Sequence, residues 1–103
     1  MRVAICDDEP IIRDQIAEFV RKRDKTGEVL CFDTGEALFE SFVKQAFDLL
    51  FLDIGLPGID GVEVARKIRK GNADVMIVFI TADDSRVFDA FDVRSLQKIV
   101  FFY

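Results

Sequence analysis

A chain of 103 residues is one domain, and its half-apolar composition supplies one modest hydrophobic core. A net charge of −5 and the lack of a Lys- or Arg-rich stripe argue against direct nucleic-acid contact, since the basic cluster at residues 21–23 ends an expected helix. Without histidine, the chain cannot build a Ser-His-Asp or Cys-His triad, a His-ligated zinc site or a phosphohistidine.

The cellular compartment is predicted from what the chain lacks. No apolar run reaches the roughly 18 residues of a membrane span, and the N-terminus is typical of a strand rather than of a charged signal segment. Cys6 and Cys31 fall in strand-like runs, where we expect two reduced thiols in the core. These features predict a cytoplasmic protein without membrane contact.

Apolar runs alternate with helix-period segments, which is typical of a βαβ protein. The expected strands lie near residues 2–6, 28–32, 47–52, 75–80 and 99–103. The first helix begins near Pro10, because a first helical turn tolerates proline. Its apolar positions are Ile12, Ile16, Phe19 and Val20, which we expect to cover one face of the sheet.

Two further helices open with an acid followed by a glutamate three residues later, the pattern of a capping box. Asp33 and Glu36 start the second helix, and Asp60 and Glu63 start the third, which ends near residues 71–72. The expected apolar faces are Leu38, Phe39, Phe42 and Val43 in the second helix and Val64, Ala65 and Ile68 in the third. Arg66, Lys67, Arg69 and Lys70 are expected to point outward. A fourth helix is predicted over residues 85–93.

Three aspartates follow strands at the edge of the sheet where ligands bind in open α/β proteins. Asp7 and Asp8 close the first apolar run and Asp53 closes the third. Such a cluster is tolerable with one divalent cation, and Mg²⁺ prefers oxygen ligands. The backbone carbonyl of Gly55 can reach the same ion, since Gly55 and Gly58 let the following loop turn tightly. Acids that merely cap the first helix would explain one of these carboxylates, but not all three.

A carboxylate beside a cation can act as a nucleophile on a phosphoryl group, and Asp53 is the central candidate. Thr81 follows the fourth strand and places a hydroxyl at the same edge, where it can donate to a phosphoryl oxygen. Taken alone, Thr81 also fits a helix cap or a turn.

Three motifs together resemble the receiver domain of two-component response regulators: CDDE at 6–9, FLDIGLPGIDG at 51–61 and ITA at 80–82. The resemblance covers nearly the whole chain, and the segment 88–93 is most similar to receivers that precede a LytTR-type DNA-binding domain. It implies an α/β, flavodoxin-like (CheY-like), doubly wound sheet of five parallel strands in the order 2-1-3-4-5.

The resemblance also implies residue roles. Asp53 would be the phosphoacceptor, Thr81 the switch hydroxyl, and Asp7, Asp8, Asp53 and the Gly55 carbonyl the Mg²⁺ ligands. The phosphoryl donor would be a histidine kinase, and the output would be transcriptional.

The last strand departs from the family. Lys98 falls at the aromatic switch position and Phe101 falls where the phosphate-contacting lysine belongs. The family's fifth helix would follow Tyr103, so residues 1–103 are expected to form a truncated or variant receiver without that helix or an output domain. An uncovered aromatic edge strand predicts a homodimer or a swapped assembly.

Three classes of function follow. The first is a phosphoacceptor signalling module, and the second is a non-switching pseudo-receiver that dimerises, which Phe101 favours. The third, a Mg²⁺-dependent phosphatase, needs a general acid two residues after Asp53, where Gly55 stands. We therefore expect a phosphoacceptor domain and not a turnover enzyme.

Overall fold

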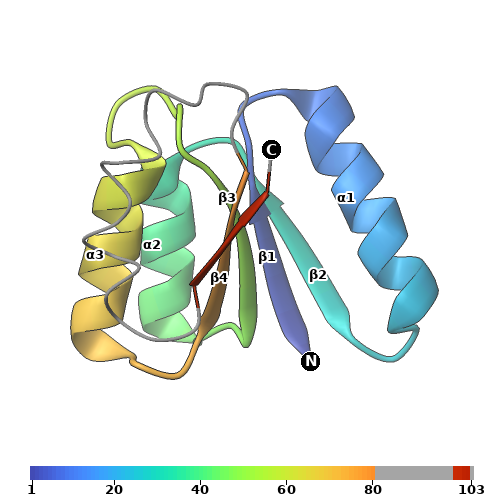
Figure 1. Cartoon of the computed structure of the whole chain (residues 1–103). Helices are drawn as coiled ribbons and strands as arrows, with labels where there is room; N and C mark the ends of the chain where they lie inside the picture. The colour runs from blue at the N-terminus through green and yellow to red at the C-terminus, as the bar shows by residue number, and fades with distance from the viewer. Residues whose placement is uncertain (81–98, 103) are drawn as a thin grey trace.

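The computed structural model describes residues 1–80 in full and the backbone of residues 99–102. The strands are β1 (Arg2–Cys6), β2 (Glu28–Phe32), β3 (Leu49–Asp53), β4 (Met76–Ile80) and β5 (Ile99–Phe102). The helices are α1 (Pro10–Arg23), α2 (Gly35–Lys44) and α3 (Gly61–Gly71). The sheet is parallel, in the order β2-β1-β3-β4-β5 (Figure 1). The predicted order of the first four strands is confirmed, and the backbone of β5 extends the sheet beside β4. The predicted fourth helix, at 85–93, lies outside the described residues.

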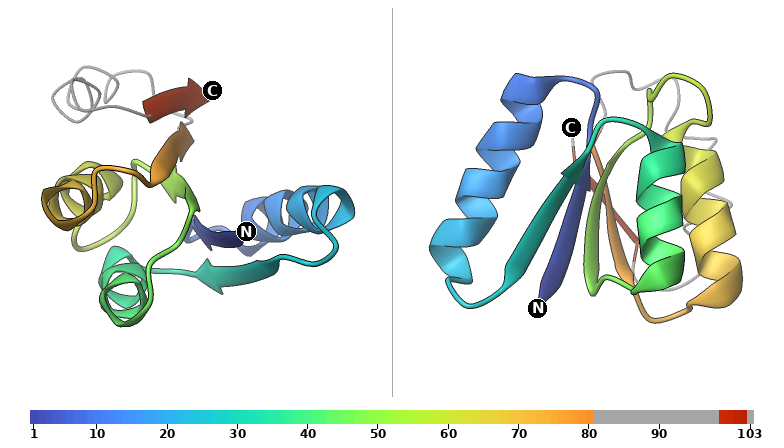
Figure 2. Two further views of the ribbon diagram at one scale, coloured as in Figure 1. Left: turned by 90° about the horizontal axis from the view of Figure 1, so that it is seen from below. Right: turned by 180° about the vertical axis from the view of Figure 1, so that it is seen from behind.

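Helices cover both faces of the sheet. α1 lies on one face, and α2 and α3 lie side by side on the other (Figure 2). The larger apolar core lies beneath α2 and α3, with Leu50, Leu52, Ile77 and Phe79 at its centre. Burial of these side chains stabilises the central strands by roughly 2 kcal/mol each. The packed core therefore holds the C-terminal ends of the central strands in place.

The third strand starts two residues later than predicted. Phe47 is buried and packs edge-on against Phe32, but it precedes the strand. The next residue, Asp48, forms the turn into β3: its backbone N–H donates to the Arg2 carbonyl at 2.8 Å, and its carboxylate accepts from the Arg2 N–H at 2.6 Å. The apolar run thus begins before the extended backbone does, and the strand continues to Asp53.

The second helix is capped by a different residue from the predicted one. Thr34, not Asp33, is the N-cap, and its hydroxyl accepts from the Ala37 N–H at 3.2 Å. Asp33 lies one residue too early for that role, and its side chain is exposed. In the third helix the predicted N-cap is confirmed, since the Asp60 carboxylate accepts from the Glu63 N–H at 3.0 Å.

We expect Thr34→Ala to lower the free energy of unfolding by about 1 kcal/mol, because the Ala37 N–H loses its acceptor. The matched change Asp33→Ala should have little effect, because that side chain does not cap the helix. Urea unfolding of both variants measures the difference. A larger loss in the Asp33 variant would contradict the assignment of the cap.

Two apolar side chains predicted to face inward are exposed. Phe19 on α1 is 53% exposed, and the Arg23 guanidinium lies 3.5 Å from the centre of its ring. Val43 on α2 is 68% exposed. The apolar stripe of each helix is narrower than its sequence suggests, since in α1 Ala17 and Val20 are the fully buried side chains. Cys31 is exposed as well, because β2 is an edge strand, while Cys6 is buried as predicted.

Arg69 was predicted to point outward and instead is 5% exposed. Its guanidinium donates to the carbonyl of Val75 at 2.7 Å, just before β4. Burial lowers the pKa of this side chain. Arg69 thereby links the end of α3 to the segment that leads into β4, a role that helix periodicity does not reveal.

Candidate functional site

The sheet brings the three predicted aspartates together. In the register of the sheet, Cys6 on β1 lies opposite Leu52 on β3, so the residues that follow them are neighbours at the C-terminal edge. Carboxylate oxygens of Asp7, Asp8 and Asp53 lie within 4.8 Å of one another. Asp7 is buried at 4% exposure, Asp53 is half-buried and Asp8 is exposed. The cluster thus has a buried inner side at Asp7 and a side open to solvent at Asp8.

Hydrogen bonds fix Asp7 at each of its polar groups. Its backbone N–H donates to the Phe32 carbonyl at 3.1 Å, extending the pairing of β1 with β2. Its carboxylate accepts from the Glu9 N–H at 2.9 Å, and its carbonyl accepts from the Arg13 guanidinium at 2.9 Å. The N-cap of α1 is Glu9, whose side chain makes no capping bond. The N-cap position of α1 is therefore not held by any acid of the cluster.

The loop after Asp53 is held by backbone contacts. One carboxylate oxygen of Asp53 accepts from the Gly55 N–H at 3.0 Å, and the Ile54 N–H donates to the Ile80 carbonyl at 3.1 Å. The loop turns at Gly58, whose φ of 71° is in the left-handed region that favours glycine. α3 begins directly against the strand, because a Cβ on Gly61 would lie 2.1 Å from the Asp53 carbonyl oxygen.

Burial and charge perturb the acids. Desolvation raises the pKa of Asp53 to about 6; the Gly55 N–H opposes this shift, and the carboxylates of Asp7 and Asp8 add to it. Desolvation also raises the pKa of Asp7. Three acids this close repel one another, so the cluster favours a proton or a cation. Hard divalent cations are bound by carboxylate oxygens, and the donor set fits Mg²⁺ on that ground.

Cys6 lies beneath the acids but is not reactive. Burial first, and the nearby Asp53 and Asp7 carboxylates next, raise the pKa of its thiol to about 12. The thiol stays protonated and donates to the Thr34 carbonyl at 3.3 Å. Cys6 is therefore not suited to act as a nucleophile at this edge of the sheet.

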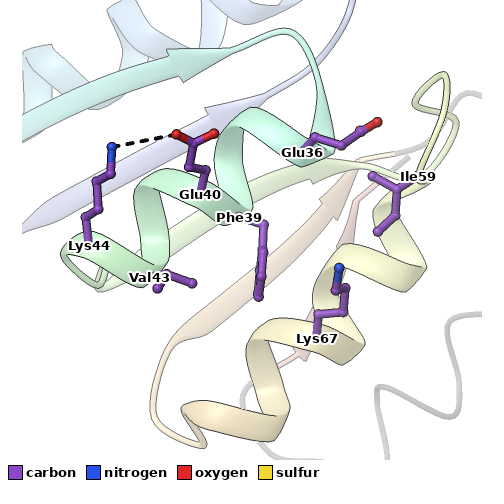
Figure 3. A pocket seen from close by; sticks show the side chains of 7 residues that line it. All are labelled: Glu36, Phe39, Glu40, Val43, Lys44, Ile59 and Lys67. Carbon is purple, nitrogen blue, oxygen red and sulfur yellow. Dashed lines mark ion pairs between the residues drawn. The ribbon is translucent and has the colours of Figure 1, made fainter.

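A hollow lies away from the acids, between α2 and α3 (Figure 3). Its volume is about 410 Å³, and Phe39, Val43 and Ile59 form its apolar lining. Charged groups surround it: an ion pair joins Lys44 and Glu40 at 3.6 Å, and the Lys67 ammonium lies 4.7 Å from the centre of the Phe39 ring. No residue of the acid cluster lines this hollow.

The sequence identified the acids of the cluster but missed two residues that support them, Arg13 and Gly61. Arg13 carried no signal beyond its charge, and Gly61 stood inside a recognised motif without an assigned role. Thr81 and Lys98 lie outside the described residues, and Phe101 is described by its backbone, which pairs with Phe79.

In the part of the chain that the structure describes, no helix combines the length and the hydropathy needed to cross a membrane.

Comparison with known proteins gives a consistent result. Residues 3–98 match the family described as the response regulator receiver domain. The sensory transduction protein LytT of Bacillus subtilis is 35% identical over 99 residues, which are 96% of this chain and 41% of LytT. LytR of Staphylococcus epidermidis is 31% identical over 100 residues, 97% of this chain and 40% of LytR. The chain thus spans about 41% of the length of such relatives.

Solved structures agree with the fold. The crystal structure of the response regulator protein TrrA from Thermotoga maritima, in complex with Mg²⁺ and BeF, superposes with a TM-score of 0.82. The two chains are 32% identical, and the match covers 99% of this chain and 86% of TrrA.

Proposed function

Because this chain belongs to the response regulator receiver domain family, we propose that it accepts a phosphoryl group on Asp53 in a Mg²⁺-dependent reaction. A receiver is a signalling module of two-component systems and not a turnover enzyme. The observation that carries the proposal is the convergence of three carboxylates within 4.8 Å at the C-terminal edge of the sheet.

Asp7, Asp8 and Asp53 would hold the cation, with the carbonyl of Gly55 as a further ligand. Carboxylate and carbonyl oxygens are the ligands that Mg²⁺ prefers. When bound, Mg²⁺ supplies charge neutralisation for the phosphoryl oxygens. The Mg²⁺ in the TrrA complex supports this choice of metal.

The proposed transfer uses the Asp53 carboxylate as nucleophile. One of its oxygens attacks the phosphorus of a phosphohistidine, and a P–O bond forms as the P–N bond breaks. The electron pair of the broken bond returns to the imidazole nitrogen of the donor. Asp53 suits this role because its half-buried carboxylate is ionised above its pKa of about 6, and the Gly55 N–H orients one oxygen.

The donor is proposed to be a histidine kinase, which suits a chain with no histidine of its own. Thr81 is proposed to follow the phosphoryl group as the switch hydroxyl, since it comes directly after Ile80 at the end of β4. A transcriptional output is proposed because the sequence of residues 88–93 resembles receivers that precede a LytTR-type DNA-binding domain, and a domain other than the receiver of residues 1–103 would carry that output. The receiver itself would make no nucleic-acid contact and would act in the cytoplasm.

The experiment that tests the proposal is intact mass measurement after incubation with Mg²⁺ and acetyl phosphate. We expect the parent and Asp33→Asn to gain one phosphoryl group, and Asp53→Asn to gain none. Asp33 is the matched control because it is an exposed acid near the same edge that lies outside the cluster. A gain in the Asp53 variant would refute the assignment of the phosphoacceptor.

The second candidate is a non-switching pseudo-receiver, and the identity of Phe101 favours it. This residue pairs with Phe79 near the end of β4, at the position where the family carries a phosphate-contacting lysine. Without that cation, the phosphorylated state loses part of its electrostatic stabilisation. Absence of phosphorylation in a parent chain that binds Mg²⁺ would favour this candidate over the first.

We also propose that β5 mediates a homodimer or a swapped assembly. Among the described strands, β5 has β4 as its one neighbour, so β5 forms one edge of the described sheet, and edge strands favour pairing with another chain. Light scattering at micromolar concentration is expected to give twice the mass of the 11.7 kDa chain. A monodisperse monomer would contradict this prediction.

A further inference from the structure

We propose that Arg13 is a positioning residue of the acid cluster, which holds the backbone of Asp7 and thereby orients Asp7 and Asp8 toward a divalent cation. The inference rests on the proposed function, because it concerns how the chain prepares its Mg²⁺ ligands. Arg13 makes no contact with the cation in this proposal and acts through the peptide that carries the ligands.

Arg13 lies in the first turn of α1, and its side chain is half-buried. Its guanidinium donates to the Asp7 carbonyl at 2.9 Å, and its backbone N–H donates to the Glu9 carbonyl at 3.1 Å. One residue therefore ties both ends of the segment 7–9 to the helix. α1 is in turn anchored to the sheet through Ala17 and Val20, which pack against Val3 and Ile5.

The bond to Arg13 completes the constraint on Asp7. The other two contacts of this residue fix its N–H against β2 and its carboxylate against the Glu9 N–H. The carbonyl of Asp7 belongs to the peptide that leads into Asp8, so the bond from Arg13 sets the plane of that peptide. Asp8 is exposed and depends on this backbone for its placement. Removing the bond would leave Asp8 to be ordered only when the cation binds, at a cost in affinity.

The charge of Arg13 and its positioning role predict effects of opposite sign on the affinity for Mg²⁺. A guanidinium near the acids repels a dication, so if charge dominated, removing Arg13 would tighten Mg²⁺ binding. If positioning dominates, as we propose, removing Arg13 weakens Mg²⁺ binding although it deletes a positive charge. The sign of the change in affinity therefore separates the two roles.

The test is a Mg²⁺ titration by calorimetry of the parent chain, Arg13→Met and Arg13→Gln, with Arg21→Met as the matched control. Met keeps the apolar stem of the arginine without its donors, and Gln keeps a shorter polar side chain. Arg21 is an exposed arginine on the same helix, about 12 Å farther along it. Its variant therefore reports the general effect of losing one positively charged side chain. Thermal unfolding without Mg²⁺ reports the stability of each variant separately.

We expect both Arg13 variants to bind Mg²⁺ about fivefold more weakly than the parent, the equivalent of one lost hydrogen bond, while the Arg21 variant binds like the parent. Equal or tighter binding in a folded Arg13 variant would overturn the inference, and if Arg13→Met does not fold, the sign for Arg13→Gln decides. A parent chain that does not bind Mg²⁺ at all would instead refute the proposed function on which the inference rests.

Discussion

Replacing Gly61 with alanine is expected to lower the free energy of unfolding by about 2–3 kcal/mol, although alanine is the better helix former. The added Cβ would lie 2.1 Å from the carbonyl oxygen of Asp53 and 3.0 Å from the Cα of Ile54. Both neighbours are backbone atoms, so α3 or the end of β3 must move. The movement would also displace the candidate phosphoacceptor.

Gly71→Ala is the matched control, because Gly71 ends the same helix and a Cβ there would have no neighbour within 4 Å. We expect this variant to be unchanged or more stable by up to about 1 kcal/mol. Urea unfolding compares the two. Equal stability of both variants would show that the end of β3 accommodates a methyl group and that the close approach does not constrain the site.

Asp53→Asn is expected to raise the free energy of unfolding of the metal-free protein by about 1–2 kcal/mol at pH 7. The folded protein raises the pKa of this carboxyl from 3.8 to about 6, chiefly through burial. A shift of that size corresponds to about 3 kcal/mol in full, and contact of the half-buried group with water reduces the effect. Asparagine fills the same space without the charge.

The pH dependence of this gain in stability follows from the direction in which folding shifts the pKa of Asp53. Between about pH 4 and pH 6 the folded state binds a proton that the unfolded chain has released, so the Asp53 contribution to stability falls as pH rises. Above pH 6 the full cost of the buried charge is present, and below pH 4 it is absent. The advantage of Asp53→Asn should therefore be full at pH 7 and vanish near pH 4.

Chemical unfolding at pH 7 and at pH 4, without Mg²⁺, measures this advantage. Asp33→Asn serves as the control, because Asp33 is exposed and should give little change at either pH. A gain from Asp53→Asn that is the same at both values would mean that the charge of Asp53 is not its source.

The sequence alone determined where the acids gather. Strands buried on both faces are read from their apolar runs, and the first and third runs end on carboxylates. The parallel sheet that the alternating pattern requires must therefore bring Asp7, Asp8 and Asp53 to one edge. The start of α1 at Pro10 and the cap at Asp60 were also predictable, because both depend on contacts within one turn of the chain.

Where the local sequence allowed two similar arrangements, as at the N-cap of α2 and at Arg69, the tertiary structure determined which one forms. Asp33 and Thr34 are both good caps in the sequence, and the helix begins after Thr34. Periodicity placed Arg69 outside, but the turn into β4 offers the Val75 carbonyl as a partner within reach, so the guanidinium is buried there. A helix pattern contains no information about a carbonyl on the following strand.

Only the tertiary structure revealed the supports of the acid cluster. The bond from Arg13 to the Asp7 carbonyl depends on how α1 lies against β1, and the role of Gly61 depends on the distance between α3 and β3. The position of α1 and the distance of α3 from β3 are set by side-chain packing between elements. Neither can be read from the type and spacing of single residues in the sequence. The sequence determined the chemistry of the site through its acids, and the packing of α1 and α3 against the sheet decided how firmly those acids are held.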